Sequence, residues 1–455
     1  MGNGRMENEH RIEALTHGIW YRGRAGELAA WYGAHPELGS DRFWSGSGAR
    51  DIRRMHSGLP ALMVDVLTDI VCGELLGVRV SDAGAQADWD RIAEESGFGR
   101  LLRYAVRAAL AEGDGAFKVA FDTMESDLPL LTFHPANEIR FEKRRYRTDE
   151  IMFDTRFEEN GRRYLLTEVY GRGGVTYRLE NSRGEGIGLE TLAATERLAA
   201  VVNPRGFMPG AVLMFDESYR YAGRGRSMFD GKTGAFDALD ECVSQWVDAL
   251  RDGRVQTYIP DGYLPRDPET GALRRPNRFG ARFVLKEEAA AESVTPRIEI
   301  VQPEIRTDAL LETYKTFLDL SLTGVLSPST LGIDVKKLDN AEAQREKEKV
   351  TLYTRGRLIG VLREVVPKVV KASIATLDWM RGADERKFDV NVEFGEYANP
   401  SFEAVVETVG KAVAAGIMSL ENAMEELYGD SKTMEQKNEE VARIRAGRGF
   451  GDGAE

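Results

Sequence analysis

The chain contains few of the residues from which disulfides and metal sites are built. Its two cysteines, Cys72 and Cys242, stand in separate apolar segments, so we expect buried free thiols and no disulfide. The histidines fall in the first third of the chain and form neither an HExxH motif nor a cluster with cysteine. We therefore expect no metal site. The histidines are His10, His17, His35, His56 and His134.

Long apolar runs and catalytic motifs are also missing. No stretch of about eighteen apolar residues occurs, which predicts no membrane span, and the polar N-terminal stretch shows no secretory signal. No serine stands in a GxSxG elbow, and no pair of carboxylates suggests acid–base catalysis. The sequence thus predicts neither an enzyme active site nor a cofactor.

The segment GRSMFDGKT, Gly225 to Thr233, comes nearest to a nucleotide-binding motif. A phosphate-binding loop has four residues between its first glycine and Gly-Lys-Thr, whereas five stand here. The polar stretch YRYAGRG precedes the segment, where such a loop would follow a hydrophobic strand. We interpret it as a chance near-match.

The chain is acidic, with a formal net charge of −13. This charge argues against tight wrapping of nucleic acid, which needs many lysines and arginines to neutralise phosphates. It is compatible with loose contact, because an acidic wall repels phosphates and keeps a moving duplex from adhering.

An unusual order of elements fills the second half of the chain. Apolar periodicity predicts a helix over Ser227–Leu250 with Ser227 as N-cap, and a second over Thr307–Leu322 capped by Thr307. A β-rich insert, Arg254–Pro303, separates them. This order suits a subunit that reaches out of its own domain to line a channel or join a ring.

A proline-bearing loop, Gly324–Asp339, then leads to a predicted helix over Ala341–Met380. At 1.5 Å per residue that helix would be roughly 60 Å long. Pro367 lies inside it and predicts a kink about one turn earlier. Asp339 and Glu342 have the spacing of a capping box at its start.

The flanking regions mix helices and strands, so the predicted fold class is α+β. Helices are expected over Leu59–Val71 and Phe98–Ala111, and strands over Leu75–Val80 and Ala116–Phe121. Between Leu130 and Leu179, alternating runs predict an antiparallel sheet with a hairpin turn at Asn160-Gly161. The run FDVNVEF predicts a strand that returns to this sheet. Helices over Phe402–Ala415 and after a Ser419 cap are expected near the C-terminus.

Three sets of charged residues stand out as candidates. The polar face of the predicted helix Ser227–Leu250 carries Asp237, Asp240, Glu241 and Asp248, and it is either a solvated face or a channel wall. Two cations, Lys336 and Lys337, lie on the following loop. The insert reverses the acidity of the chain with arginines that include Arg266, Arg274, Arg275, Arg278 and Arg282.

Four passages in this order resemble the portal (head-to-tail connector) proteins of tailed bacteriophages. The first passage resembles a helix that runs into a short strand near the portal N-terminus. The second resembles a helix followed by a Glu-Gly-Asp turn and a strand. The others resemble the portal loop with its long helix, and a common portal ending. They are LPALMVDVLTDIVCGELLGVRV, RAALAEGDGAFKVAFD, LSPSTLGIDVKKLDNAEAQREKEKVTLYTRGRL and AVAAGIMSLENAMEELYGDSKTMEQKNEEVARI, and the resemblance spans about residues 20–446.

The resemblance implies a portal fold with an α/β wing, a helical stem, a β-rich clip, a long kinked helix and a small helical crown. The parts would be the wing (1–226), stem helices (227–253 and 304–323), clip (254–303), tunnel loop (324–339), long wing helix with return strand (340–400), and crown with a disordered tail (401–455).

A portal is not an enzyme: the resemblance implies a ring, usually of about twelve copies, through which double-stranded DNA is packaged and ejected. The acidic stripe and Lys336-Lys337 would face the DNA without sequence preference, and the arginines of the insert would dock the motor and the adaptor. The implied partners are terminase, the head–tail adaptor, and major capsid and scaffold proteins. The implied location is the virion, and the host cytoplasm during assembly.

Two other hypotheses stay open. The chain would be another virion component, such as a minor capsid protein or an adaptor, although adaptors are generally shorter. Alternatively it would be a nucleotide-dependent enzyme that uses Gly225–Thr233, in which case Lys232→Ala would abolish nucleotide binding.

Overall fold

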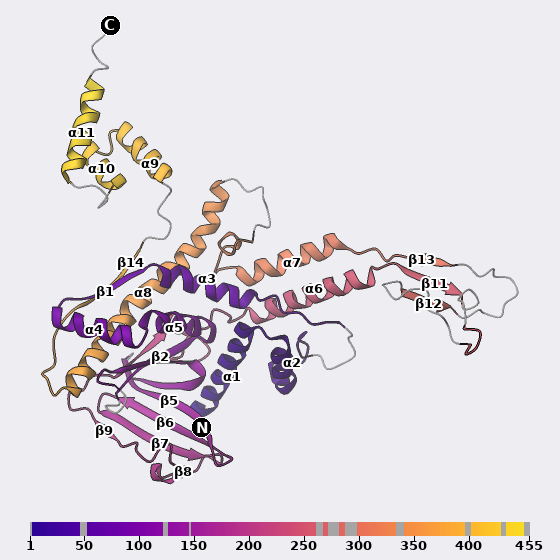
Figure 1. The fold of residues 1–455 in the computed structure, drawn as a ribbon, viewed down its shortest axis with the longest axis horizontal. Coiled ribbons are helices and arrows are strands. Elements are labelled where there is room, and N and C mark those ends of the chain that lie inside the picture. Colours follow the sequence, from indigo (N-terminus) through magenta and orange to yellow (C-terminus); the bar gives the residue numbers. More distant parts are fainter. Residues whose placement is uncertain are drawn as a thin grey trace, which may run out of the picture. The chain divides into compact units, whose positions relative to one another are not determined.

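The computed structural model describes residues 2–45, 52–121, 126–144, 147–260, 267–271, 282–286, 298–333, 341–395, 402–428 and 434–449. The chain divides into two compact units, Met1–Glu393 and Phe394–Glu455. Helices and sheets both build the first unit, which confirms the α+β class (Figure 1). No helix within the described residues is long and apolar enough to cross a membrane.

A layer of helices opens the first unit, and α5 lies at its centre. Phe98, Leu102, Val106 and Leu110 repeat every four residues and are buried, so one face of α5 packs on β2 and β3. Its other sides contact α1, α3 and α4. The helices are α1 (Gly2–Arg22), α2 (Ala25–Ala34), α3 (Leu59–Gly73), α4 (Ala83–Glu95) and α5 (Phe98–Glu112).

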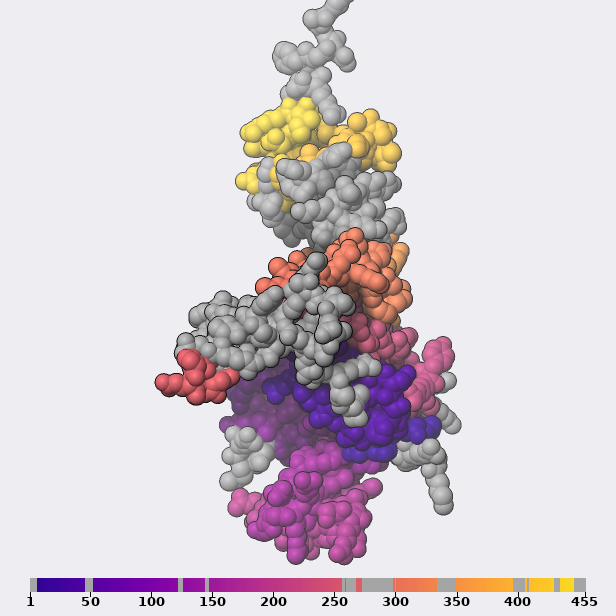
Figure 2. All heavy atoms as spheres, turned by 90° about the vertical axis from the view of Figure 1, so that its right-hand side faces the viewer, coloured from indigo at the N-terminus to yellow at the C-terminus, as the bar shows by residue number. Residues whose placement is uncertain are grey.

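One antiparallel sheet packs on these helices, and a second antiparallel sheet contacts the first through β5 and β10. One has the order β10-β2-β3 and the other the order β4-β5-β6-β7-β8, with β9 pairing β7. The bounds are β2 (Asp114–Ala120), β3 (Leu130–Pro135), β4 (Ile139–Arg144), β5 (Arg147–Glu159), β6 (Arg162–Gly171), β7 (Gly174–Asn181), β8 (Gly186–Ile187), β9 (Val201–Val202) and β10 (Gly210–Met214). In Figure 2 the residues of β5 to β8, in magenta, form the lower end of this unit.

The sheet confirms the predicted hairpin. Asn160 and Gly161 have φ of 52° and 71°, the left-handed pair that a two-residue turn between twisted strands requires. Phe153 and Ile151 of β5 are buried with Tyr170 of β6 in the main core cluster of the sheet.

The return strand β14 (Val390–Phe394) forms as predicted but pairs with β1 (Leu75–Val80) in a separate two-stranded sheet. The expectation that it rejoins the main sheet is therefore wrong. Alternation of apolar residues predicts a strand, but it does not identify the edge that the strand pairs with.

A helical hairpin with a small sheet at its tip occupies the middle of the chain (Figure 1). α6 (Thr233–Asp252) and α7 (Thr307–Leu322) pack side by side, and β11 (Gln256–Pro260) pairs with β12 (Arg282–Lys286) and β13 (Glu299–Val301). We call α6 with α7 the stem hairpin.

The starts of the two stem helices differ from prediction. Gly231 has a φ of 74°, which ends any helix from Ser227, so α6 begins at Thr233. Ser227 instead donates its hydroxyl to Ala111 O at 2.5 Å and accepts from Phe229 N. Thr307 is the first residue of α7 and not its cap.

The long helix α8 (Ala341–Met380) has the predicted bounds and continues through Pro367. Its residues Leu362, Val366 and Val369 are buried, and α8 contacts β10, α3 and α4 within the first unit. The 3-10 turn η5 (Pro328–Leu331) is held to α8 because Thr351 bonds Ser327 and Thr330. The kink at Pro367 stays a prediction, and Asp339 lies outside the described residues.

The second unit consists of α9 (Phe402–Ala414), α10 (Leu420–Tyr428) and α11 (Met434–Gly449). Gly416, with a φ of 69°, ends the segment of α9, and Ser419 caps α10 by accepting from Asn422 N at 3.2 Å. Both features confirm the sequence prediction. Met424 of α10 and Val441 of α11 are buried.

A buried ion pair fixes the loop that leads into the stem. Asp114 is fully buried at the start of β2, and its carboxylate accepts hydrogen bonds from Arg224 Nη2 at 2.8 Å and Nε at 2.9 Å. Gly225 N donates to the same carboxylate at 2.7 Å. A Cβ on Gly225 would lie 2.2 Å from Gly113 O. The backbones of these two segments therefore touch, and only glycine fits at position 225.

We expect Arg224→Met to lower the free energy of unfolding by about 3–5 kcal/mol, because Asp114 would keep a buried charge without its partner. Burial alone would raise the pKa of Asp114, but the charge and hydrogen bonds of Arg224 outweigh it and hold the pKa below 3.8. This contribution is complete above the unfolded value and is lost as the pH falls through the lower folded one.

Urea unfolding at neutral pH and near pH 3 measures both effects. The exposed Arg178→Met serves as the control and should change the free energy of unfolding by less than about 0.5 kcal/mol. Equal stability of Arg224→Met and the parent chain at neutral pH would contradict the role of the pair.

Candidate functional site

The stem hairpin is the candidate functional element. Its two helices contact each other at both ends of the hairpin. At its base, Lys232 Nζ donates to Thr323 O at 2.8 Å and so caps the C-terminus of α7. Near its tip, Gly253 approaches Ile305 so closely that a Cβ would lie 2.5 Å from the isoleucine Cδ1. The two helices therefore run antiparallel along their full length.

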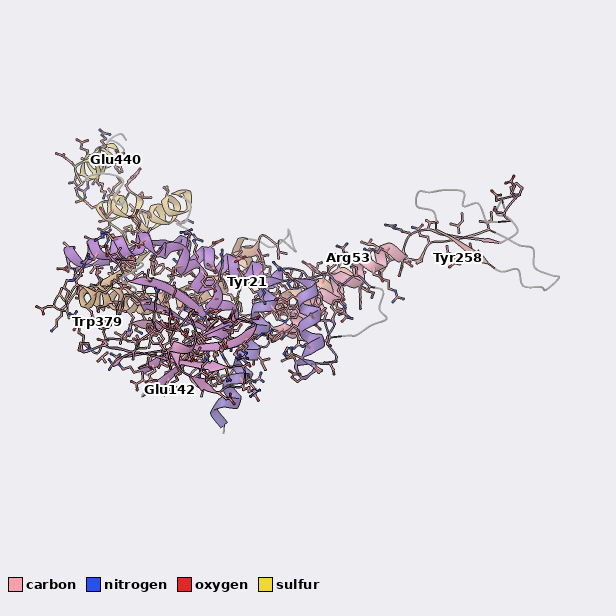
Figure 3. All side chains as sticks on the ribbon, turned by 60° about the horizontal axis from the view of Figure 1, so that its bottom comes forward. Tyr21, Arg53, Glu142, Tyr258, Trp379 and Glu440 are labelled. Carbon is pink, nitrogen blue, oxygen red and sulfur yellow. The ribbon has the colours of Figure 1, made fainter. Side chains whose placement is uncertain are left out.

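One polar face of α6 is covered by the N-terminal part of the chain. Asp240 is fully buried and accepts from Trp44 Nε1 at 3.1 Å, His56 Nδ1 at 2.7 Å and Ser57 N at 2.7 Å. These donors come from residues 44, 56 and 57, which lie beside α6; Figure 3 shows the exposed residue Arg53 next to the hairpin.

Two more residues of α6 hold the same segment. Asp237 accepts from Phe43 N at 2.9 Å and Trp44 N at 3.4 Å, and Ser244 Oγ accepts from Met55 N at 2.9 Å. Burial raises the pKa of Asp237, although the two backbone N–H groups oppose the rise. We call Asp237, Asp240 and Ser244 the α6 clamp.

The clamp corrects the sequence prediction. Asp237 and Asp240 were expected on an exposed or channel-facing stripe, but each is buried and hydrogen-bonded within its own chain. Helical periodicity correctly separates the polar face of α6 from its apolar face, and it does not show that another segment covers the polar one. Glu241 and Asp248 remain partly exposed.

An exposed acidic stripe lies on α7, where the sequence prediction did not place one. Asp308, Glu312 and Asp319 are exposed and follow the four- and seven-residue spacing of one helix face, with Lys315 between them. That spacing was the signal that could have found them. Between the two helices, a groove of about 360 Å³ is lined by Glu241, Gln245, Arg306 and Phe317 among others.

The predicted cations fall largely outside the described residues. Lys336 and Lys337 lie in the undescribed stretch 334–340, and Arg266, Arg274, Arg275 and Arg278 also lie outside the described residues. Arg282 opens β12, where it pairs in register with Gln256 of β11.

The tip sheet itself combines both strand directions: β12 runs parallel to β11, and β13 runs antiparallel to it. Tyr258 marks this sheet in Figure 3, and Ile300 and Val301 of β13 are exposed. The sheet thus presents apolar side chains at the outer end of the hairpin.

The segment Gly225–Thr233 forms the turn between the buried ion pair and α6. A cavity of about 300 Å³ is lined by Arg226, Asp230 and Lys232 from this segment and by Arg357 of α8. Arg357 is paired with Asp216, and Lys232 is directed at the end of α7. The lysine therefore supports the base of the stem hairpin.

The chain was compared with known proteins. It matches no family model and no curated protein. Among solved structures, it is 11% identical to a chain of "Neck of native GTA particle computed with C12 symmetry", with a TM-score of 0.39, over 82% of this chain and 90% of that one.

Two further structures give similar values. A chain of "Virion of native gene transfer agent (GTA) particle" is 14% identical, with a TM-score of 0.39, over 84% of this chain and 96% of that one. A chain of "Neck of empty GTA particle computed with C6 symmetry" is 12% identical, with a TM-score of 0.41, over 82% and 90%. At these scores the likeness is distant.

We expect Asp240→Ala to lower the free energy of unfolding by about 3 kcal/mol or more, because three donors lose one buried charged acceptor. Glu241→Ala, one residue along on a partly exposed position, is the matched control and should change it by less than about 0.5 kcal/mol. Denaturant unfolding at one fixed protein concentration measures both. If the two variants are equally stable, the α6 clamp does not stabilise the fold.

Proposed function

We propose that this chain is a portal subunit, copies of which form a ring at one vertex of a phage-like capsid. The observation that carries the proposal is the stem hairpin, which leaves the α/β core, ends in a small sheet and returns to a forty-residue helix. The four sequence passages that resemble portals support the same reading, and they include the Gly113-Asp114-Gly115 turn. In the ring, α6 and α7 would form the stem and β11 to β13 the clip.

The charges of the hairpin suit a conduit. Asp308, Glu312 and Asp319 on α7, together with Glu241 and Asp248 on α6, would give the channel wall a negative field that repels phosphates. Asp237 and Asp240 have no part in this wall, because they are buried. DNA would slide without sequence-specific contact, and its motion would be driven by the ATPase of a separate terminase.

The clip and the loop after η5 are the proposed contact regions. The arginines of the insert would bind terminase during packaging and the head–tail adaptor afterwards, so both partners would use one surface in turn. Lys336 and Lys337 would touch phosphates as DNA passes. Major capsid and scaffold proteins would surround the ring.

Electron microscopy of the purified chain, combined with its solution mass, tests the proposal. A ring of about twelve or thirteen copies with a central hole is expected. A monomer or dimer that hydrolyses nucleotide, with loss of hydrolysis in Lys232→Ala, would overturn the proposal in favour of the enzyme hypothesis. Small oligomers without hydrolysis, which stay small when scaffold protein is added, would favour another virion component.

Neutralising the acidic stripe of α7 should make the channel adhere to DNA. The triple variant Asp308→Asn, Glu312→Gln, Asp319→Asn is expected to tighten non-specific binding of DNA to the ring by about tenfold at low salt. Fluorescence anisotropy with duplex DNA, at several salt concentrations, measures the change.

The matched control removes the same charge elsewhere, at the exposed Glu94, Glu190 and Glu196, each replaced by Gln. This variant should bind DNA almost as the parent ring does. Equal tightening in both triple variants would show that net charge acts, and that α7 does not line the channel.

Reversing the loop cations, Lys336→Glu with Lys337→Glu, should lower packaging or retention of DNA while rings still assemble. Packaged DNA per particle and ring formation by microscopy are the two measurements. Reversal of the exposed Lys368 and Lys371 on α8 is the control. Unchanged packaging in the loop variant would make Lys336 and Lys337 ordinary surface residues.

A further inference from the structure

One face of α1 carries ionisable residues that meet the loop before the stem. Glu13 and His17 are four residues apart and so lie on the same face of the helix. Opposite them is Asp230 of the segment that precedes α6. One potential ligand atom from each of the three side chains lies within 4.8 Å of the other two.

His17 has no hydrogen bond within the described part of the chain, although it is only 4% exposed. Its Nε2 is directed at Asp230 Oδ1, 3.8 Å away, which is too far for a hydrogen bond. Its ring packs edge-on against Phe229. A neutral imidazole carries a lone pair on one ring nitrogen, and this is the form that binds a metal ion.

Hydrogen bonds orient one of the two carboxylates, that of Glu13. Glu13 Oε2 accepts from Tyr221 Oη and from Arg220 Nη1 at 2.9 Å. Asp230 Oδ2 faces Arg226 Nε at 4.0 Å, while Oδ1 faces His17. Tyr221 and Arg220 thus hold one oxygen of Glu13, which is a usual outer support of a metal-binding carboxylate.

We propose that Glu13, His17 and Asp230 bind a divalent transition-metal cation, of which zinc is the representative. One imidazole nitrogen and two carboxylate oxygens are ligands that zinc takes, and a water would complete four-fold coordination. Ligand atoms around zinc lie about 3.3 Å apart, given bonds of about 2.0 Å, so the carboxylates need to move inwards by about an ångström. Both are partly exposed and have room to do so.

The cation has a route to the site, because Asp230 also lines the open cavity of about 300 Å³ beside Arg226 and Lys232. Once bound, it would join α1 to the segment that leads into α6, next to the buried Asp114–Arg224 pair. The metal would thus fasten the N-terminal helix to the base of the stem hairpin. This role is the same for an isolated chain and for a ring.

Calorimetric titration of the full chain with Zn²⁺, after treatment with chelator and its removal, tests the site. We expect one zinc per chain and a rise in Tm of at least about 3 °C at saturating zinc. Asp230→Asn and Glu13→Gln keep the side-chain shapes, and each should weaken binding by at least about tenfold. His17→Asn should abolish it.

The control is His134→Asn. His134 lies 3.1 Å from Glu138 in a more exposed pair that could also attract zinc, and its replacement should leave the affinity and the stoichiometry unchanged. If the parent chain binds no zinc, the cluster is held by its arginines and hydrogen bonds alone. The site is equally overturned if Asp230→Asn and Glu13→Gln both bind as the parent does. Since neither result depends on ring formation, failure of this site is distinguishable from failure of the proposed function.

Discussion

The buried pair of Asp114 and Arg224 sets the path of the chain between the α/β core and the stem. Arg224 also donates to the carbonyl oxygens of Ala136 at 2.9 Å and Ile139 at 3.1 Å, so one guanidinium joins the start of β2, the start of β4 and the approach to α6. A charge taken out of water is stable only with such complete partnering. The direction in which the hairpin leaves the core therefore depends on one side chain.

The α6 clamp fixes the same hairpin from the other side. The Asp114–Arg224 pair holds the loop before α6. The α6 clamp instead binds the first three turns of α6 itself, through Asp237, Asp240 and Ser244. Hydrogen bonds to buried carboxylates are directional and short, and a hydrophobic contact would allow the helix to slide. The base of the hairpin is thus held by hydrogen bonds to two other parts of the chain.

Local patterns in the sequence predicted the elements well where a single segment decides the outcome. The bounds of α7 and α8 and the Asn160-Gly161 turn follow from periodicity and from glycine at left-handed φ. Prediction was wrong where a distant segment decides: Asp237 and Asp240 are covered by residues near the N-terminus, and β14 pairs with β1. The helix α4, capped by Asp82, was not anticipated, although Trp89 and Ile92 have the spacing of a buried helix face. No sequence pattern brings Asp230 to Glu13 and His17, because the fold alone makes them neighbours.

The α6 clamp also has a consequence for the timing of folding. The hydrogen bond from Phe43 to Asp237 joins residues 194 positions apart. At a synthesis rate of about 5–20 residues per second, the segment around Trp44 would wait roughly 10–40 s for α6 to leave the ribosome. During that interval Trp20 lacks its neighbour Phe236 and Trp44 lacks its acceptor Asp240, so the nascent N-terminal part exposes aromatic surface. Completion of the N-terminal helical layer therefore has to follow the synthesis of α6, although most of its own residues are made much earlier.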